Sequence, residues 1–226
     1  MQLGRVAAAA VMRRRAQDPG RGKGTAREIP MRQAKILAAI VLGLAAGAGL
    51  ATGAFARQDD ILKNRIDDPK KDHWTTQGTE QKTSVAKSDG VPGGFAYRVK
   101  VNTAGPNDWS TAASTTIAGP IKKGDVVLFA FWARAEKPPK GAEAVRVNAR
   151  VQQSAAPYTG VVEAFDVPIG PEWKMYFASG KSPIDLGAGQ ANAAVHLGKA
   201  VQTVDLGPSM VLDFGPDYPL AKLPKN

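Results

Sequence analysis

Residues 145–152 have the sequence Val-Arg-Val-Asn-Ala-Arg-Val-Gln, the clearest alternation of apolar and polar side chains in the 226-residue chain. Successive side chains of a β-strand point to opposite faces of a sheet, so this period of two predicts a strand with one buried face. The other face carries Arg146, Asn148, Arg150 and Gln152. All four can form hydrogen bonds, so this face is either an outer surface in water or the floor of a groove.

The sequence on either side has the same character. Short apolar segments are separated by Gly, Pro, Asn and Asp, which favour turns. No long segment of the body shows a helical period. Strands are expected at 95–101, 109–117, 126–133, 145–152, 161–167, 173–178, 195–197, 201–206 and 210–214. About ten short strands with regular turn signals predict an all-β protein, an antiparallel sandwich or barrel.

Most aromatic side chains are expected to stabilise this fold rather than to bind a ligand, because aromatic residues are usually buried. Trp74 and Trp173 are expected to belong to the framework. Five phenylalanines are predicted to lie in the core: Phe95, Phe129, Phe131, Phe165 and Phe214.

The charge and cysteine content exclude several classes of function. The formal net charge is +10, but residues 57–226 hold 21 Lys and Arg against 18 Asp and Glu. The basic excess lies in residues 1–56, so no nucleic-acid partner is expected. The chain has no cysteine. This excludes disulfides, thiolate metal sites, a cysteine nucleophile and a lipidated-cysteine anchor.

Residues 31–56 show the three-part pattern of a secretory signal peptide. A short basic segment, 31–35, precedes an uncharged apolar run, 36–54, and Ala54-Phe55-Ala56 then supplies the small residues that a signal peptidase recognises. We therefore predict cleavage after Ala56. The alternative is an uncleaved anchor, because a run of about 19 residues can span a bilayer.

Residues 1–30 are too long for the basic segment of a signal peptide, so translation is expected to start at Met31. Residues 57–226 are expected to form one domain, secreted or periplasmic, with no membrane contact after cleavage.

Several short motifs occur in order between residues 65 and 215. They are Asp72-His73-Trp74-Thr75, Gly94-Phe95-Ala96-Tyr97-Arg98-Val99, Asn107-Asp108-Trp109-Ser110, Lys123-Gly124-Asp125 running into Leu128-Phe129-Ala130-Phe131-Trp132-Ala133-Arg134-Ala135, Pro157-Tyr158, Glu172-Trp173-Lys174-Met175-Tyr176, His196-Leu197-Gly198 and Gln202-Thr203-Val204-Asp205-Leu206-Gly207-Pro208. Together they resemble the carbohydrate-binding modules of the family 4/9 type, jelly-roll modules attached to xylanases and glucanases.

The resemblance implies a galactose-binding-domain-like jelly roll, an antiparallel two-sheet sandwich with a concave face that binds sugar. It also implies a structural calcium ion in many members. Residues 62–72 lack the Asn-Pro-Gly-Phe-Glu type of start that is common in the family, so the sequence identifies no calcium ligands. No other cofactor is expected.

A sugar offers apolar C–H faces and hydroxyl edges, so its site needs flat aromatic rings and planar hydrogen-bonding groups. The candidates of these types are Trp109, Trp132, Tyr158, Asn148, Arg150, His196 and Gln202. Our hypothesis places Trp109, Trp132, Tyr158 and Gln202 on the concave face.

Each candidate also has a structural interpretation. Trp109 follows a turn and is either a platform for the ligand or part of the sandwich rim. Trp132 is out of phase with Phe129 and Phe131, so it is expected on the opposite face of its strand, in the site or outside it. Gln202 either contacts the ligand or supports Trp109. His196 is a ligand contact or a polar residue at a strand end.

Catalysis has weaker support in the sequence. Glycoside hydrolysis needs two carboxyl groups across the scissile bond. Glu163 and Asp166, three residues apart, are expected on opposite faces of one strand. Gly-x-Ser-x-Gly, His-Glu-x-x-His and phosphate-loop motifs are absent. The sequence therefore predicts an exported, monomeric, non-catalytic module for a polysaccharide or oligosaccharide such as xylan or β-glucan. The alternatives are a jelly-roll glycoside hydrolase or polysaccharide lyase, and an envelope scaffold or adhesion module without a sugar ligand.

Overall fold

The computed structural model describes residues 61–68 and 74–226, so the predicted signal peptide and His73 lie outside the described residues. Ten strands of this part form two antiparallel five-stranded sheets. The first sheet has the order β1 (Thr75–Gln77), β4 (Ala112–Ile117), β9 (Ala191–His196), β6 (Val145–Gln153) and β7 (Gly160–Ile169). The second sheet has the order β2 (Gln81–Lys87), β3 (Phe95–Val101), β10 (Gln202–Asp213), β5 (Val126–Lys137) and β8 (Lys174–Lys181).

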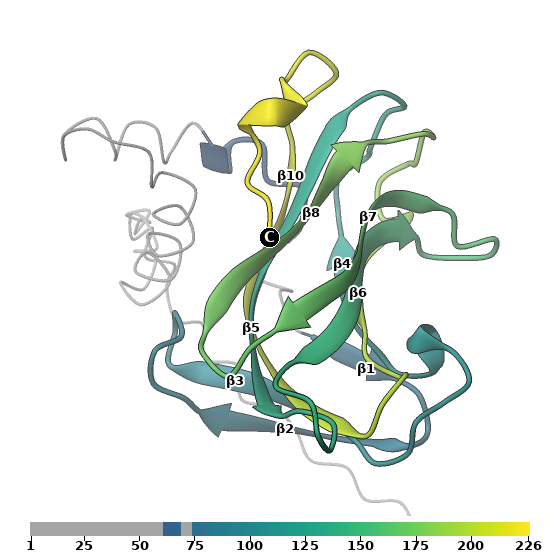
Figure 1. Cartoon of the computed structure of the whole chain (residues 1–226). Helices are drawn as coiled ribbons and strands as arrows, with labels where there is room; N and C mark the ends of the chain where they lie inside the picture. The colour runs from purple at the N-terminus through teal and green to yellow at the C-terminus, as the bar shows by residue number, and fades with distance from the viewer. Residues whose placement is uncertain (1–60, 69–73) are drawn as a thin grey trace, which may run out of the picture.

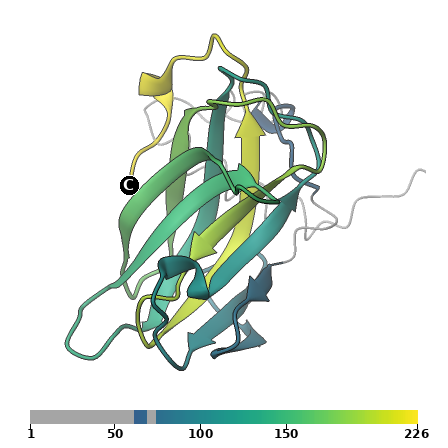
Figure 2. The ribbon, with the colours of Figure 1, turned by 90° about the vertical axis from the view of Figure 1, so that its right-hand side faces the viewer.

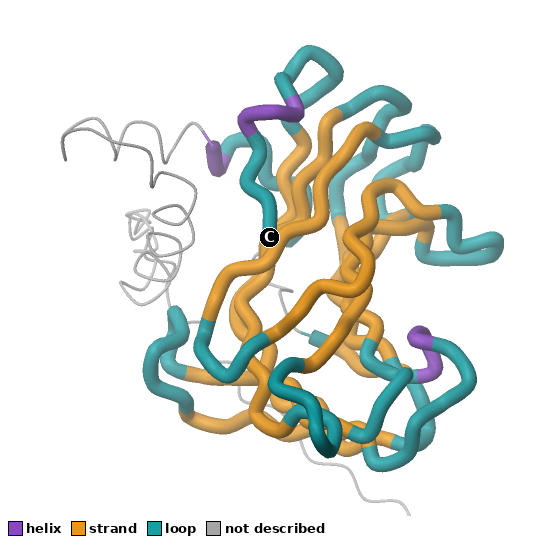
Figure 3. The backbone as a smooth tube through the Cα atoms, viewed as in Figure 1, coloured by secondary structure: helices purple, strands orange, loops and turns teal. Residues whose placement is uncertain are grey.

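The two sheets pack face to face, which confirms the predicted antiparallel jelly-roll sandwich. Figure 1 shows β4, β6 and β7 in one layer and β2, β3, β5 and β8 in the other. Loops and turns connect the strands at the ends of both layers (Figure 3). Two short 3₁₀ helices also occur among the described residues, η1 (Asp108–Ser110) and η2 (Leu220–Lys222). None of the helical segments in this part of the chain has the length and apolar character needed to cross a membrane.

The core lies between the sheets and follows the period of two that the sequence shows. In β6, the apolar side chains of Val145, Val147, Ala149 and Val151 are buried. From the second sheet, Phe129 and Phe131 of β5 enter the same cluster. Because alternate side chains point to opposite faces, the polar side chains of β6 must then lie on the outer face of the first sheet.

Several strand predictions differ from the structure. β1 and β2 were not predicted, β4 begins three residues after the predicted start at Trp109, and β5 and β8 extend beyond their predicted ends. Two further differences have a cause in the sequence. β9 begins at Ala191, four residues before the predicted start. The prediction missed residues 191–194 because they are mostly alanine, which has a low β-propensity. The predicted break at Gly207-Pro208 lies inside β10. There the pairing with β5 shifts register between Leu206 and Ser209, so the turn residues mark a β-bulge within one long strand.

The predicted burial of Phe95 and Phe165 is wrong. Phe165 is 66% exposed because the β6–β7 pairing shifts register beside it, and Asp166 has a φ of 55°. This bulge interrupts the alternation that the prediction assumed. Phe95 is also exposed. It is the first residue of β3 and pairs with Lys87 of the edge strand β2, at the end of β3 that lies outside the core.

A buried carboxylate joins three strands on the outer face of the second sheet. Asp205 of β10 is completely buried. It accepts hydrogen bonds from Arg98 of β3, at 2.7 and 3.0 Å, and from Arg134 of β5, at 3.0 and 2.9 Å. Arg134 also lies 5.3 Å from the centre of the Trp173 ring. The interaction of the carboxylate with two guanidinium groups compensates for the removal of its charge from water.

We predict that Asp205→Asn lowers the free energy of unfolding by about 2 kcal/mol, because it removes the buried one of two carboxylates that Arg98 and Arg134 share, while the more exposed Glu136 still pairs with both. Urea unfolding measures the change, and Asp217→Asn, at an exposed position, is the matched control. Equal stability of the two variants would contradict this role of Asp205.

Candidate functional site

A pocket of about 590 Å³ lies over the first sheet. Eleven described residues line it: Gln77, Trp109, Ala112, Ser114, Arg150, Gln152, Pro157, Tyr158, Asn192, Ala194 and His196. They come from β1, β4, β6 and β9, from η1 and from the loop after β6. The first sheet faces the viewer in Figure 2, with η1 at one end of its strands.

Strand register sets the floor of the pocket. His196 of β9 pairs with Asn148 of β6 on one side and with Ala112 of β4 on the other. One step along the same face, Ala194 pairs with Arg150 and Ser114. The short side chains of Ala112, Ser114 and Ala194 leave the centre of the floor low, and this makes the hollow.

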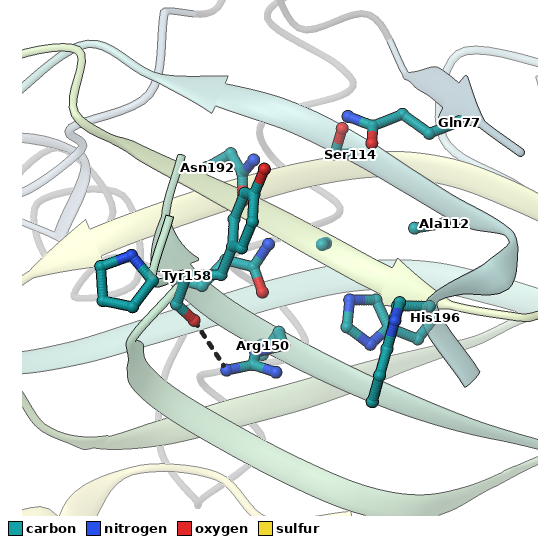
Figure 4. Close-up of a pocket in the computed structure, with 11 residues that line it drawn as sticks. Gln77, Ala112, Ser114, Arg150, Tyr158, Asn192 and His196 are labelled. Atoms are coloured by element: carbon teal, nitrogen blue, oxygen red, sulfur yellow. Dashed lines mark hydrogen bonds between the residues drawn. The ribbon is translucent and has the colours of Figure 1, made fainter. Parts of the chain in front are cut away.

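Two exposed aromatic side chains form walls of the pocket. Trp109, in η1, is 60% exposed, and Tyr158, in the loop between β6 and β7, is 55% exposed. Tyr158 has a φ of 56°, a backbone conformation that is unfavourable for a residue with a Cβ. Residues held in such conformations cluster at functional sites. Figure 4 shows Tyr158 and His196 at opposite ends of the hollow, with Arg150 between them.

Polar groups on the floor have unused hydrogen-bonding capacity. The guanidinium of Arg150 donates from Nη2 to Oε1 of Glu163, at 2.8 Å, and to the backbone oxygen of Tyr158, at 3.3 Å. Within the described part of the chain, Arg150 Nε and Asn192 Oδ1 are buried and have no hydrogen-bond partner. One is a donor and the other an acceptor, and because both atoms are buried, a hydroxyl group can bind either only if the side chain turns towards the pocket.

A polar network supports the end of the pocket near Trp109. The carboxylate of Asp108 accepts a hydrogen bond from Asn148 Nδ2, at 2.5 Å, and its Oδ2 lies 3.2 Å from Nδ1 of His196. Burial alone raises the pKa of Asp108, but the bonds from Asn148 and His196 outweigh this and lower it below 3.8. Burial also lowers the pKa of His196, which is 4% exposed, below 6.5. At neutral pH a neutral His196 therefore donates its Nδ1 proton to an ionised Asp108.

The structure brings four of the seven predicted residues into the pocket: Trp109, Tyr158, Arg150 and His196. Asn148 lies beside it and binds Asp108 and the backbone N–H of Asp166, at 2.8 Å. The polar face of β6 is thus part of a pocket floor, the second of the two interpretations left open by the sequence.

The prediction that Trp132 and Gln202 share this face is wrong. Trp132 does face away from Phe129 and Phe131, as predicted, but β5 belongs to the second sheet, so Trp132 packs on the outer face of that sheet. Gln202 is buried and its Nε2 donates to the backbone oxygen of Leu197, at 2.7 Å. The N–H of Leu197 binds Thr111 O, so Gln202 supports the segment that carries Trp109.

Four polar residues of the pocket were not among the site candidates: Gln77, Ser114, Gln152 and Asn192. Of these, only Gln152 was noted in the sequence, on the polar face of its strand. Asn192 lies among alanines, and β1, with Gln77, is a three-residue strand without a clear apolar pattern. Only the pairing of β6 with β9, of β9 with β4 and of β4 with β1 brings these residues together.

The described residues do not offer a carboxylate-rich site for the calcium ion that many family members hold. In 61–68 and 74–226, no three His, Cys, Asp or Glu side chains gather as metal ligands. The buried carboxylate of Asp67, near the start of the described chain, is bound by the Arg65 guanidinium and the N–H of Val211. The calcium ion that the family resemblance implies therefore stays a prediction.

Comparison with known families identifies the chain. The family model described as "Carbohydrate binding domain", of the 4/9 type, matches residues 59–201. The chain belongs to this family. The matched region includes every strand of the first sheet, and thus the whole pocket.

The solved structures include similar modules at low sequence identity. A family 4 module is 19% identical, with a TM-score of 0.48, and the match covers 69% of this chain and 98% of that one. The family 22 and catalytic modules of a xylanase of Clostridium thermocellum, complexed with xylohexaose, are 14% identical, with a TM-score of 0.46 and coverage of 69% and 28%. A xylan-binding family 22 module of Paenibacillus barcinonensis is 11% identical, with a TM-score of 0.43 and coverage of 66% and 91%. None of the curated proteins matches the sequence.

We predict that His196 makes the stability of the carbohydrate-binding domain pH-dependent. Its pKa is lower in the folded state, so its contribution to stability is complete above 6.5 and is lost as the pH falls through the folded-state value. The free energy of unfolding should decrease between about pH 7 and pH 5, where histidine titrates. His196→Gln should flatten this dependence, because glutamine can donate to Asp108 without titrating.

Urea unfolding at a series of pH values measures this in a His73→Gln background, which leaves His196 as the one histidine of the sequence. An unchanged slope in His196→Gln would assign the pH dependence to other groups.

Proposed function

We propose that this chain is an exported, non-catalytic module that binds a polysaccharide or oligosaccharide, such as xylan or β-glucan, in the pocket between Trp109 and Tyr158. The observation that carries the proposal is the pair of exposed aromatic rings at the ends of a polar hollow, in a chain of a carbohydrate-binding family. Aromatic rings stack on the apolar faces of sugar rings, and polar groups on the floor bind the hydroxyls.

The balance of charge supports a neutral glycan. Arg150 is the one Lys or Arg among the eleven lining residues, and Glu163 neutralises it through a salt bridge of 2.8 Å. His196, with its lowered pKa, adds no charge at neutral pH. A uronic acid would therefore find little net positive charge in the pocket.

The composition of the pocket favours binding over hydrolysis. Hydrolysis needs one carboxyl group as acid and a second as base or nucleophile, about 5–10 Å apart. None of the eleven lining residues is Asp or Glu. The nearest acidic residues are occupied, Glu163 by Arg150 and Asp108 by Asn148 and His196.

Export is proposed from the sequence alone. The pattern of residues 31–56 predicts a cleaved signal peptide, and the cysteine-free chain needs no oxidising or reducing compartment to fold. Mass spectrometry of the mature N-terminus after expression in a secreting host tests the predicted cleavage after Ala56.

Affinity gel electrophoresis of residues 57–226 tests the proposed function. The gels contain xylan, β-glucan, mannan, a cellulose derivative or alginate, and reducing-sugar release is assayed on the same samples. We expect retardation by a neutral polysaccharide without sugar release. Sugar release would indicate a hydrolase. Absence of retardation in all gels would reject glycan binding and favour a scaffold or adhesion module.

Substitution of the aromatic walls should weaken binding without unfolding the domain. We expect Trp109→Ala and Tyr158→Ala each to lower affinity by about tenfold to a hundredfold, the usual effect of removing an aromatic anchor. Both side chains are largely exposed, so the melting temperature should change little.

Trp132→Ala is the matched control for these variants. It removes a tryptophan that packs on the outer face of the second sheet, so it should lower stability and leave affinity unchanged. Loss of affinity in Trp132→Ala but not in Trp109→Ala, at a temperature where both are folded, would show that the site lies elsewhere.

A further inference from the structure

Trp109 is an exposed side chain on a very short helix. The indole stands on a 3₁₀ helix of three residues, with one internal backbone bond of 3.2 Å between Ser110 N and Asn107 O. A helix this short is unstable without other contacts, because its formation fixes several dihedral angles for one hydrogen bond. Within the segment, Asn107 N also donates to Ser110 Oγ, at 3.2 Å. These few local contacts leave the position of Trp109 to be set mainly by the neighbouring strands.

Asp108 provides a polar connection to two of these strands. Its carboxylate binds Asn148 of β6 and His196 of β9, which are directly paired in the sheet, so the two donors converge on one group. Its backbone oxygen accepts a third bond, at 2.7 Å, from Gly198 N. Asp108 does not line the pocket, so its carboxylate is engaged beneath the wall and not with a ligand.

Two glycines let the backbone of this segment pack directly against its neighbours. A Cβ on Gly198 would lie 2.6 Å from the backbone nitrogen of Thr111, and a Cβ on Gly78 would lie 2.5 Å from the backbone oxygen of Ser110. Gly78 also has a φ of 115°, which disfavours other residues. The backbone at Gly78 and at Gly198 thus packs directly against η1 and Thr111.

We propose that Asp108 is a positioning residue that fixes η1 to the first sheet and so holds the Trp109 ring in the orientation that stacks on a sugar. The inference rests on the proposed function, because it assigns a role to Asp108 in the same site. A ring that is rigid before binding loses less conformational entropy when the ligand binds, and this raises affinity without a new contact.

The first test measures the free protein and needs no ligand. In residues 57–226, the ¹⁵N order parameter of the Trp109 amide should be about 0.85 in the unmodified protein and should fall below about 0.6 in Asp108→Ala. The amides of β6 and β9 should remain rigid. Asp217→Asn, at an exposed position of the C-terminal segment, should change neither. An unchanged order parameter at Trp109 in Asp108→Ala would overturn the proposal.

The second test is a double-mutant cycle in affinity, measured by gel retardation in the polysaccharide that binds the unmodified protein. We expect Asp108→Ala to lower affinity about tenfold in the presence of Trp109 and less than about twofold in the Trp109→Ala background, because it acts through that ring. Asp108→Asn keeps an acceptor oxygen and should retain part of the affinity. If Asp108→Ala does not fold, Asp108→Asn takes its place in the cycle.

The outcomes separate the two proposals. If the unmodified protein binds no polysaccharide, the proposed function fails, whatever the order parameter of Trp109. If it binds, but Asp108→Ala lowers affinity equally in both backgrounds, Asp108 acts by another route than Trp109 and the positioning role is rejected.

Discussion

The requirement that each sheet bury one face against the other determines both the fold and the pocket. In β6, burial of Val145, Val147, Ala149 and Val151 leaves the alternate side chains only the outer face of the first sheet. A shift of one residue would exchange the two sets and expose four apolar side chains to water. The positions of Asn148 and Arg150 in the site are thus fixed by packing on the opposite side of the strand.

The same constraint explains why the hollow forms where it does. On the outer face of the first sheet, the size of each side chain helps to set the local height of the surface. Ala112, Ser114 and Ala194 are short and lie in adjacent strands. The walls come from outside the strands, since Trp109 lies in η1 and Tyr158 in a loop. A rigid sheet therefore supplies the floor, and connecting segments supply the aromatic groups.

Local patterns predicted most strands and the all-β class, because alternation and turn chemistry depend on neighbours in the sequence. The two-sheet jelly roll came from the family resemblance, and the four pocket residues came from the chemistry of a sugar site together with that resemblance. Local patterns did not predict which sheet a strand joins. Trp132 was assigned the correct face of β5, yet β5 lies in the sheet opposite the pocket. Asn192 was missed for the same reason: only its pairing with Gln152 of β6 brings it to the site. Sheet membership is a property of long-range pairing, which one sequence does not show.

Both aromatic walls are held through residues of the floor, and this bears on how a sugar is bound. Trp109 is held through Asp108, whose carboxylate binds His196, and the backbone of Tyr158 accepts a bond from Arg150. Arg150 also pairs with Glu163 and retains an unpaired Nε. A hydroxyl that binds Arg150 would therefore contact the group that orients the second wall. Recognition at the floor and placement of Tyr158 are coupled through one guanidinium, and His196, which lines the floor and binds Asp108, links the floor to Trp109 in the same way.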